Sequence, residues 1–132
     1  MPQVNITVIG DSPSPQQKAA LFEEITDLMV SILGRTRKLV VVSVATASAS
    51  DWSAGGAART SGGVVGVQAV LKILAGTASD DQKTQMIEQM TNILRSVLGQ
   101  PSMPLYAIFE EIPPNSWGYD GRPVSALAHA PS

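Results

Sequence analysis

A proline stands directly after the initiator methionine, at the head of an alternating apolar segment that runs from Val4 to Ile9. If Met1 is removed, the nitrogen of Pro2 becomes a secondary amine, and an α-amino group has an ordinary pKa of only about 8. Burial among apolar residues disfavours the cation and lowers that pKa further. Pro2 is therefore a candidate general base at neutral pH, although proline is also a common first residue of an edge strand.

Few other side chains of this sequence suit catalysis. It has no cysteine and a single histidine, His129, so a Ser-His-Asp triad, a Cys-His pair or a transition-metal cluster is hard to build. The pairs of adjacent carboxylates are Glu23-Glu24, Asp80-Asp81 and Glu110-Glu111. The first two pairs are expected on solvated helix faces, whereas Glu110 and Glu111 are neighbours on a predicted strand and point to opposite sides. We expect no metal and no cofactor.

Composition limits the classes of partner. The 132 residues carry a formal net charge of −2, with 44% hydrophobic and 15% charged residues. Such a chain has no basic field that would attract nucleic acid, and its apolar content suggests a surface that is buried in an oligomer. The longest apolar run, 39–44, is far too short to span a membrane, and the N-terminus lacks the features of a signal peptide. We therefore predict a cytoplasmic protein of one domain, 1–132, that binds neither nucleic acid nor membrane.

The chain contains an internal repeat. A shift of 65 residues places Ser14, Gln17, Lys18, Glu23, Thr26, Ser31, Leu33, Gly34, Trp52 and Gly56 onto Ser79, Gln82, Lys83, Glu88, Thr91, Ser96, Leu98, Gly99, Trp117 and Gly121. The pattern predicts a first β-α-β unit at 2–60, a linker at 61–66 and a second β-α-β unit at 67–125. A turn-rich tail that contains a tryptophan follows the second strand of each unit.

Local signals mark the elements of each unit. The two helix starts carry capping boxes, Ser14 with Gln17 and Ser79 with Gln82. Apolar residues then recur at helical spacing until Gly34 and Gly99, which are typical of helix ends. The apolar segments 39–44 and 105–109 are expected to return parallel to the first strand of their own unit. The sequence therefore predicts an α+β domain with a four-stranded sheet and both helices on one face.

The uncovered face of that sheet predicts an oligomer. The segment 39–44 is apolar on both strand faces, a pattern typical of strands that are covered on both sides. Two helices can cover only one face of a four-stranded sheet. The other face must therefore contact another subunit, which favours a closed oligomer.

Three sequence features together resemble the 4-oxalocrotonate tautomerase family. They are the Met1-Pro2 start of an alternating strand, the Ser-Pro-Gln-Gln-Lys helix start at 14–18, and the tail 113–118 that is followed by Gly121. The similarity covers nearly the whole chain twice, so the chain resembles a fused member that holds two of the family's short subunits. This resemblance implies a tautomerase/MIF-like fold and a homotrimer that mimics the hexamer of the short members, a pseudo-hexamer.

The resemblance also implies roles for individual residues. Pro2 corresponds to the family's general base, which moves a proton between carbons of an enol or dienol and its conjugated ketone. The second copy has Gln68 at the matching position, without a free amine, so one base is expected in each chain. Trp52 and Trp117 correspond to the aromatic wall of the pocket, and the assembly decides which of them faces Pro2.

The two arginines with which short members hold a dicarboxylate are missing. Asp11 or Ser12 and Thr77 or Ala78 stand at the first position, and Val41 and Tyr106 at the second. A dicarboxylate substrate is therefore not expected. Other groups could polarise a substrate: Lys72, which is in phase with Gln68 on the third strand, Tyr106, and Arg59 and Arg122 after the two tails. For each of these four side chains, a structural or solvated role is the alternative.

The sequence favours an isomerase that acts on a small unsaturated or 2-oxo acid by keto-enol or 1,3-proton transfer. Within the same fold, Pro2 could instead activate water, as in a hydratase, dehalogenase or decarboxylase relative, although those enzymes depend on arginines that Thr77 and Ala78 do not supply. A catalytically silent assembly or binding protein would also keep the fold. Replacement of Pro2 separates the enzyme from the silent protein, because only the enzyme has activity to lose.

Overall fold

The computed structural model describes residues 2–59 and 62–128. The main elements are β1 (Gln3–Gly10), α1 (Pro15–Ser31), β2 (Val41–Ala47), β5 (Val64–Leu74), α2 (Asp80–Leu98) and β6 (Tyr106–Ile112). Short hairpins follow β2 and β6, namely β3 (Ser53–Ala54) with β4 (Ala57–Ala58) and β7 (Gly118–Tyr119) with β8 (Arg122–Pro123). Single 3-10 turns are η1 (Arg37–Leu39), η2 (Ala49–Asp51), η3 (Pro114–Ser116) and η4 (Val124–Ala126). Within the described residues, no helix has the length and apolarity needed to cross a membrane.

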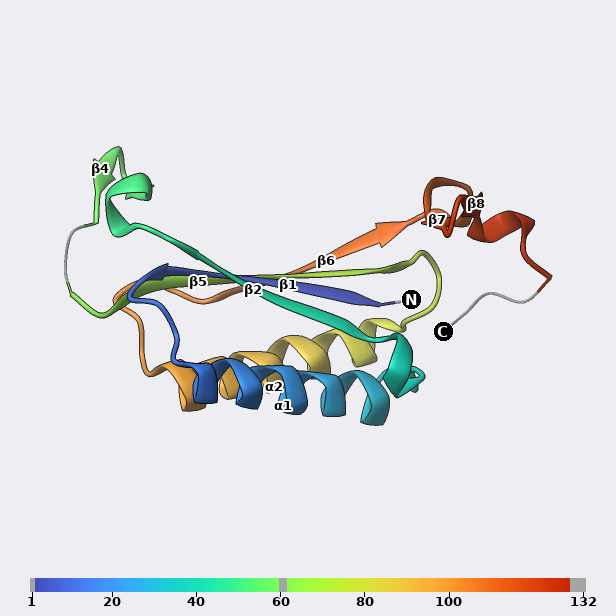
Figure 1. The fold of residues 1–132 in the computed structure, drawn as a ribbon, viewed down its shortest axis with the longest axis horizontal. Helices are drawn as coiled ribbons and strands as arrows, with labels where there is room; N and C mark the ends of the chain where they lie inside the picture. Colours follow the sequence, from blue (N-terminus) through green and yellow to red (C-terminus); the bar gives the residue numbers. More distant parts are fainter. Residues whose placement is uncertain (1, 60–61, 129–132) are drawn as a thin grey trace.

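The sheet has the strand order β2-β1-β5-β6. β1 runs parallel to β2 and β5 runs parallel to β6, whereas the two central strands, β1 and β5, are antiparallel. Both helices pack on one face, and the two hairpins rise at opposite ends of the sheet on the other side (Figure 1). The predicted α+β architecture, with a parallel strand pair in each unit, is confirmed.

Both helices start with the predicted capping box. The hydroxyl oxygen of Ser14 accepts a hydrogen bond from the backbone N–H of Gln17 (3.1 Å), and the Gln17 side-chain oxygen accepts one from the backbone N–H of Ser14 (2.8 Å). Ser79 and Gln82 repeat both bonds at 3.1 and 2.9 Å. Backbone donors that a helix start leaves unpaired are therefore satisfied in both repeats.

The same two glutamines also join the helices to each other. The side-chain amide of Gln17 donates to the carbonyl of Val97 near the end of α2 (3.0 Å), and that of Gln82 donates to the carbonyl of Ile32 just after α1 (3.1 Å). Each helix start thus caps the end of the other helix. This reciprocal pattern shows that the two repeats are related by an approximate twofold axis.

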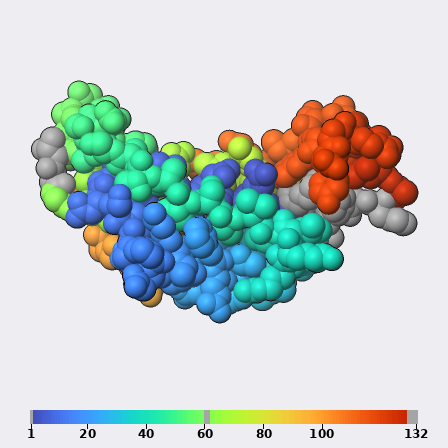
Figure 2. Space-filling view, in the orientation of Figure 1, coloured from blue at the N-terminus to red at the C-terminus, as the bar shows by residue number. Residues whose placement is uncertain are grey.

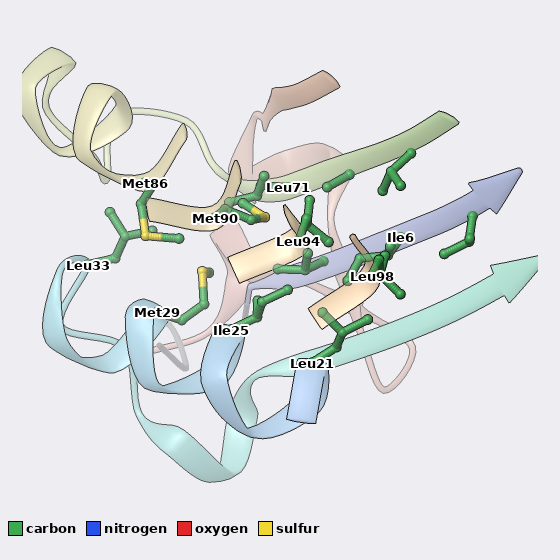
Figure 3. Packing of buried hydrophobic residues seen from close by; sticks show 14 of the residues in the cluster. Ile6, Leu21, Ile25, Met29, Leu33, Leu71, Met86, Met90, Leu94 and Leu98 are labelled. Atoms are coloured by element: carbon green, nitrogen blue, oxygen red, sulfur yellow. The ribbon is translucent and has the colours of Figure 1, made fainter. Parts of the chain in front are cut away.

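The core lies between the sheet and the helices (Figure 3). Fully buried side chains come from one face of each central strand and from the inner faces of both helices: Val4, Ile6, Val8, Ala69, Leu71, Leu21, Ile25, Met29, Met86, Met90 and Leu94. Each large apolar side chain removed from water in this way contributes roughly 1.5–3 kcal/mol to stability. The period of two along the strands and the helical spacing of the sequence account for this packing.

The strand register corrects one assignment made from the sequence. Gln3 lies opposite Val41, and Gln68 lies opposite Tyr106, so Gln3 and Gln68 are equivalent positions in the two repeats. Val67, not Gln68, therefore occupies the position that Pro2 has in the first repeat. β5 already begins at Val64, within the predicted linker, and residues 60–61 of that region lie outside the described ranges.

The face of the sheet opposite the helices is uncovered in the single chain. On this open face, Val41, Tyr106 and Ile108 are 50%, 50% and 40% exposed. Their neighbours Val42 and Val44 point to the other side and pack against the core. The upper surface is hollowed between two raised ends, which are the β3–β4 and β7–β8 hairpins (Figure 2). The expected uncovered face is therefore present, and it carries polar side chains such as Asn5 and Ser43 beside these apolar ones.

Candidate active site

A cavity of about 300 Å³ lies beside Pro2, which is itself buried. Its lining comes from the start of β1, from η1 and β2, and from the β7–β8 hairpin: Pro2, Gln3, Lys38, Leu39, Val41, Trp117, Gly118, Tyr119 and Asp120. The carbonyl of Pro2 accepts a hydrogen bond of 3.1 Å from the backbone N–H of Val41, which holds Pro2 against β2. We refer to this space as the Pro2 cavity.

The β7–β8 hairpin brings aromatic side chains to this cavity. Asp120 and Gly121 have positive φ angles of 49° and 90°, as a two-residue Asp-Gly hairpin turn requires. The backbone N–H of Val124 donates to the carbonyl of Trp117 (2.9 Å), and the side chain of Val124 is buried. Val124 therefore anchors the hairpin that presents Trp117 and Tyr119.

A second cavity of about 360 Å³ adjoins the first. It is lined by Gln3, Lys72, Glu110, Ile112, Ser116, Trp117 and Gly118. Gln3, Trp117 and Gly118 line both cavities, so the two spaces share a wall. The strand register brings the polar residues together, because Gln3 is opposite Lys72 and Lys72 is opposite Glu110. We refer to this space as the Lys72 cavity.

The other two predicted aromatic residues lie elsewhere. Trp52 precedes the β3–β4 hairpin, far from the N-terminus (Figure 1). Its indole N–H is buried and has no hydrogen-bond partner among the described residues. Tyr106 is opposite Gln68, at the same end of the sheet as Trp52. Within one chain, Trp117 is the tryptophan beside Pro2.

The two arginines proposed from the tails lie outside both cavities. Arg59 is exposed, and its backbone N–H donates to the carbonyl of Trp52 (3.1 Å). Arg122 donates from Nη2 to the carbonyl of Ala126 (3.0 Å), so it braces the tail. Among the described residues, no arginine lines either cavity, so the cationic side chains that line them are Lys38 and Lys72.

Three residues of the Pro2 cavity with ionisable side chains were not singled out from the sequence, namely Lys38, Tyr119 and Asp120. Lys38 closes the densest basic cluster of the chain, 35–38, and it lies in η1, three residues before the first residue of the strand that pairs with β1. Its place before that strand was a usable signal. The Asp-Gly pair at 120–121 was a usable signal for the hairpin that carries the other two.

The adjacent carboxylates of β6 point to opposite sides, as predicted. Glu111 faces the helices and forms an ion pair with Lys83 (3.0 Å). Glu110 faces the Lys72 cavity. In the described ranges, no group of three or more metal-ligating side chains comes together, and His129 lies outside those ranges.

Burial also affects one cation away from both cavities. Desolvation lowers the pKa of the Arg35 guanidinium from its ordinary value. Nη2 of Arg35 donates to the carbonyl oxygen (2.9 Å) and the hydroxyl oxygen (2.8 Å) of Thr77. Arg35 therefore joins the end of α1 to the loop before α2, which is a structural role.

Comparisons with known proteins agree with this architecture. The family model described as Tautomerase enzyme matches residues 2–58 and 70–127. A solved native fused 4-OT is 22% identical, with a TM-score of 0.80, and the alignment covers 96% of this chain and 99% of that chain. A fused 4-OT described as an asymmetric trimer is 20% identical, with a TM-score of 0.81 and the same coverage. Pt0534 inactivated by 2-oxo-3-pentynoate is 19% identical, with a TM-score of 0.82, again at 96% and 99% coverage.

No curated protein has a sequence that matches this chain. At identities near 20%, the likeness to solved structures shows the shared fold. The family model goes further, because it recognises the sequence of both repeats over most of the chain. The chain therefore belongs to the tautomerase family, as a fused member with two β-α-β repeats.

Proposed function

We propose that this protein is a tautomerase in which Pro2, freed by removal of Met1, is the general base for keto-enol or 1,3-proton transfer on a small unsaturated or 2-oxo acid. The observation that carries the proposal is the position of Pro2, which is buried beside a cavity of about 300 Å³ in a chain of the tautomerase family. An amine in such a place is disfavoured as a cation.

The neutral amine takes the proton of the enol hydroxyl, and the resulting ammonium returns a proton to the carbon, so each turnover leaves the enzyme unchanged. Negative charge that develops on the enolate oxygen needs a donor that is already in place. Lys38 is the cation that lines the Pro2 cavity, and Trp117 and Tyr119 supply its aromatic wall. Lys72 lies in the adjoining cavity, so its contact with the substrate would be to a more distant group.

The functional form is a homotrimer. The open face exposes Val41, Tyr106 and Ile108, and fused 4-OT structures of the same fold are described as trimers. Three chains that pack their open faces together at Tyr106 and Ile108, away from the cavities at the Pro2 end, would remove this apolar surface from water. Sedimentation should give three times the chain mass of 13.8 kDa, and a stable monomer would contradict the assembly.

Replacement of Pro2 by alanine tests the catalytic role. Ketonisation of phenylenolpyruvate should slow by about 10²- to 10⁴-fold, the usual contribution of a general base. As a matched control, an alanine inserted between Met1 and Pro2 keeps the proline ring but turns its nitrogen into an amide. That variant should lose as much activity, because the ring amine is gone. Full activity in the insertion variant, in which the nitrogen of this proline is an amide, would remove Pro2 from the mechanism.

Covalent labelling gives an independent test of the amine. The acetylenic ketone 2-oxo-3-pentynoate, with which Pt0534 was inactivated, is an electrophile that an uncharged amine can attack. It should add once per chain, at Pro2, when the peptides are mapped by mass spectrometry. Labelling and kcat/KM should both fall as pH is lowered, because protonation removes the lone pair. Labelling that is independent of pH, or is located at a lysine, would contradict the proposal.

A catalytically silent protein of the same fold is the second candidate. The observation that favours it is that no arginine among the described residues lines either cavity. A silent protein would form the trimer and show no turnover of any enol that fits the Pro2 cavity, with intact mass proving that Met1 had been removed.

A further inference from the structure

The approximate twofold symmetry of the chain offers an internal reference for the Pro2 end. Gln3 and Gln68 are equivalent by strand register, and Trp117 and Trp52 are equivalent by the same shift of 65 residues. These residues recur at both ends of the sheet, although only the first end has Pro2. Because these glutamines and tryptophans also occur at the end that lacks Pro2, their presence at the Pro2 end is not by itself evidence of a functional role.

Two charged residues break this symmetry. Lys72 corresponds to Thr7 in the first repeat, and Glu110 corresponds to Ala45. The pair on β5 and β6 at the Pro2 end therefore has an uncharged counterpart at the other end, on the equivalent parallel strands β1 and β2. Since the fold forms at the other end without these charges, Lys72 and Glu110 are candidates for a functional role at the Pro2 end.

The geometry leaves both charges available to a ligand. Lys72 and Glu110 are directly opposite each other on neighbouring parallel strands and face the same cavity of about 360 Å³. Among the described residues, Glu111 forms an ion pair with Lys83, but no ion pair joins Lys72 to Glu110. Cross-strand neighbours of opposite charge normally interact favourably. Here both side chains line the cavity without forming an ion pair with each other, so a polar group of a ligand can contact both.

We propose that the Lys72 cavity binds the tail of the substrate, and that Lys72 with Glu110 selects a neutral tail that both accepts and donates a hydrogen bond, such as a hydroxyl or a carboxamide. The substrate class is therefore an enolisable monocarboxylic 2-oxo acid with a polar, uncharged tail. This inference rests on the proposed function, which places the reacting carbons in the Pro2 cavity. The wall of Gln3, Trp117 and Gly118 that both cavities share allows one molecule to occupy them together.

Charge balance explains why a second carboxylate is disfavoured. A hydroxyl can accept from the ammonium of Lys72 and donate to the carboxylate of Glu110, so it makes two charge-assisted hydrogen bonds. A carboxylate would gain the first contact but would meet the negative charge of Glu110 and would lose its hydration. An apolar tail would make neither of these hydrogen bonds. The neutral polar tail is the one that satisfies both residues.

Three enolpyruvates that differ only at the para position of a phenyl ring test this selection. Their tails are hydrogen, hydroxyl and carboxylate. We expect kcat/KM to be highest for the hydroxyl tail and lower by about two- to fivefold for the carboxylate tail, because Glu110 is exposed and Lys72 is half-buried, so water screens part of their interaction with the tail. A carboxylate-tailed substrate that is used as well as the hydroxyl-tailed one would overturn the proposal.

Two matched variants locate the effect. Glu110→Gln removes the repelling charge and should remove most of the preference for hydroxyl over carboxylate, a change of about two- to fivefold for an exposed charge. Glu111→Gln removes the same charge one residue further along, on the helix side, and should leave that preference unchanged. Lys72→Met should weaken the use of the carboxylate tail still further. An equal shift in the Glu110 and Glu111 variants would contradict the inference, because the effect would then be one of net charge.

A binding measurement separates this inference from the proposed catalysis. The para-substituted cinnamates with the same three tails cannot tautomerise, and their dissociation constants can be measured by calorimetry. Tail preference in binding without any turnover of the enols would support the subsite and defeat the tautomerase. Turnover without tail preference in rate or binding would defeat the subsite and leave the tautomerase. Failure of all three cinnamates to bind would also overturn the subsite.

Discussion

Pro2 and Trp117 line the same cavity, although one starts the first repeat and the other belongs to the tail of the second. The antiparallel pairing of β1 with β5 is the cause. It places the start of β1 beside the end of β6, through the row Gln3, Lys72 and Glu110. The tail that follows β6 therefore reaches Pro2, whereas the tail that follows β2 is carried to the other end.

Replacement of each tryptophan by alanine should show that Trp117, and not Trp52, contributes to the site at Pro2. Trp117→Ala should lower kcat/KM for phenylenolpyruvate by about 10- to 200-fold, the range for contacts in an apolar pocket. Trp52→Ala should have a much smaller effect on kcat/KM, because Trp52 lies at the opposite end of the same chain. A larger loss for Trp52→Ala would show that a neighbouring subunit supplies the wall, contrary to the arrangement within one chain.

Lys38 should carry part of the charge stabilisation. Lys38→Met is expected to lower kcat by about tenfold to a hundredfold, less than for a fully buried donor because Lys38 is exposed. Arg37→Met is the matched control, since Arg37 is the adjacent cation and is paired with Asp27 (2.6 Å). It should keep the parent kcat. Equal losses in the two variants would point to the overall charge of this segment, not to a contact in the cavity.

The reciprocal glutamines should stabilise the fold. Gln17→Met removes a capping-box bond and the hydrogen bond to the other helix, so the free energy of unfolding should fall by about 1–2 kcal/mol. Gln16→Met changes the exposed neighbour, which has no such bond among the described residues, and should be nearly neutral. Urea unfolding at a fixed protein concentration measures both changes, because oligomer stability depends on concentration. A neutral Gln17 variant would mean that water replaces both bonds.

Replacement of Gly10 by alanine should destabilise the fold more than the same replacement of Gly34. Both have positive φ angles, 113° and 66°, which cost a residue with a side chain about 1–2 kcal/mol. A Cβ on Gly10 would in addition overlap the carbonyl oxygen of Gly63, whereas a Cβ on Gly34 would meet nothing. Thermal unfolding should therefore show a clearly larger loss of Tm for Gly10→Ala than for Gly34→Ala. Similar losses would show that the Gly63 segment can move aside without cost.

The sequence predicted much of the fold because its signals are local. Capping boxes and apolar periodicity act over one or two turns, so both helices and their buried faces follow from neighbouring residues. The length of the β-α-β connection accounts for the parallel strand pairs. Pro2 could be singled out in the same way, since its chemistry depends on its position in the chain and on an apolar strand.

The tertiary structure decided which residues surround Pro2. No local pattern specifies that β1 and β5 pair antiparallel, yet this pairing selects Trp117 over Trp52 and sends Tyr106 to the far end of the sheet. The register likewise assigns Val67 to the position equivalent to Pro2. Cavities form where segments distant in sequence meet, so their lining depends on non-local packing, whereas the elements that supply it are encoded by residues close together in the chain.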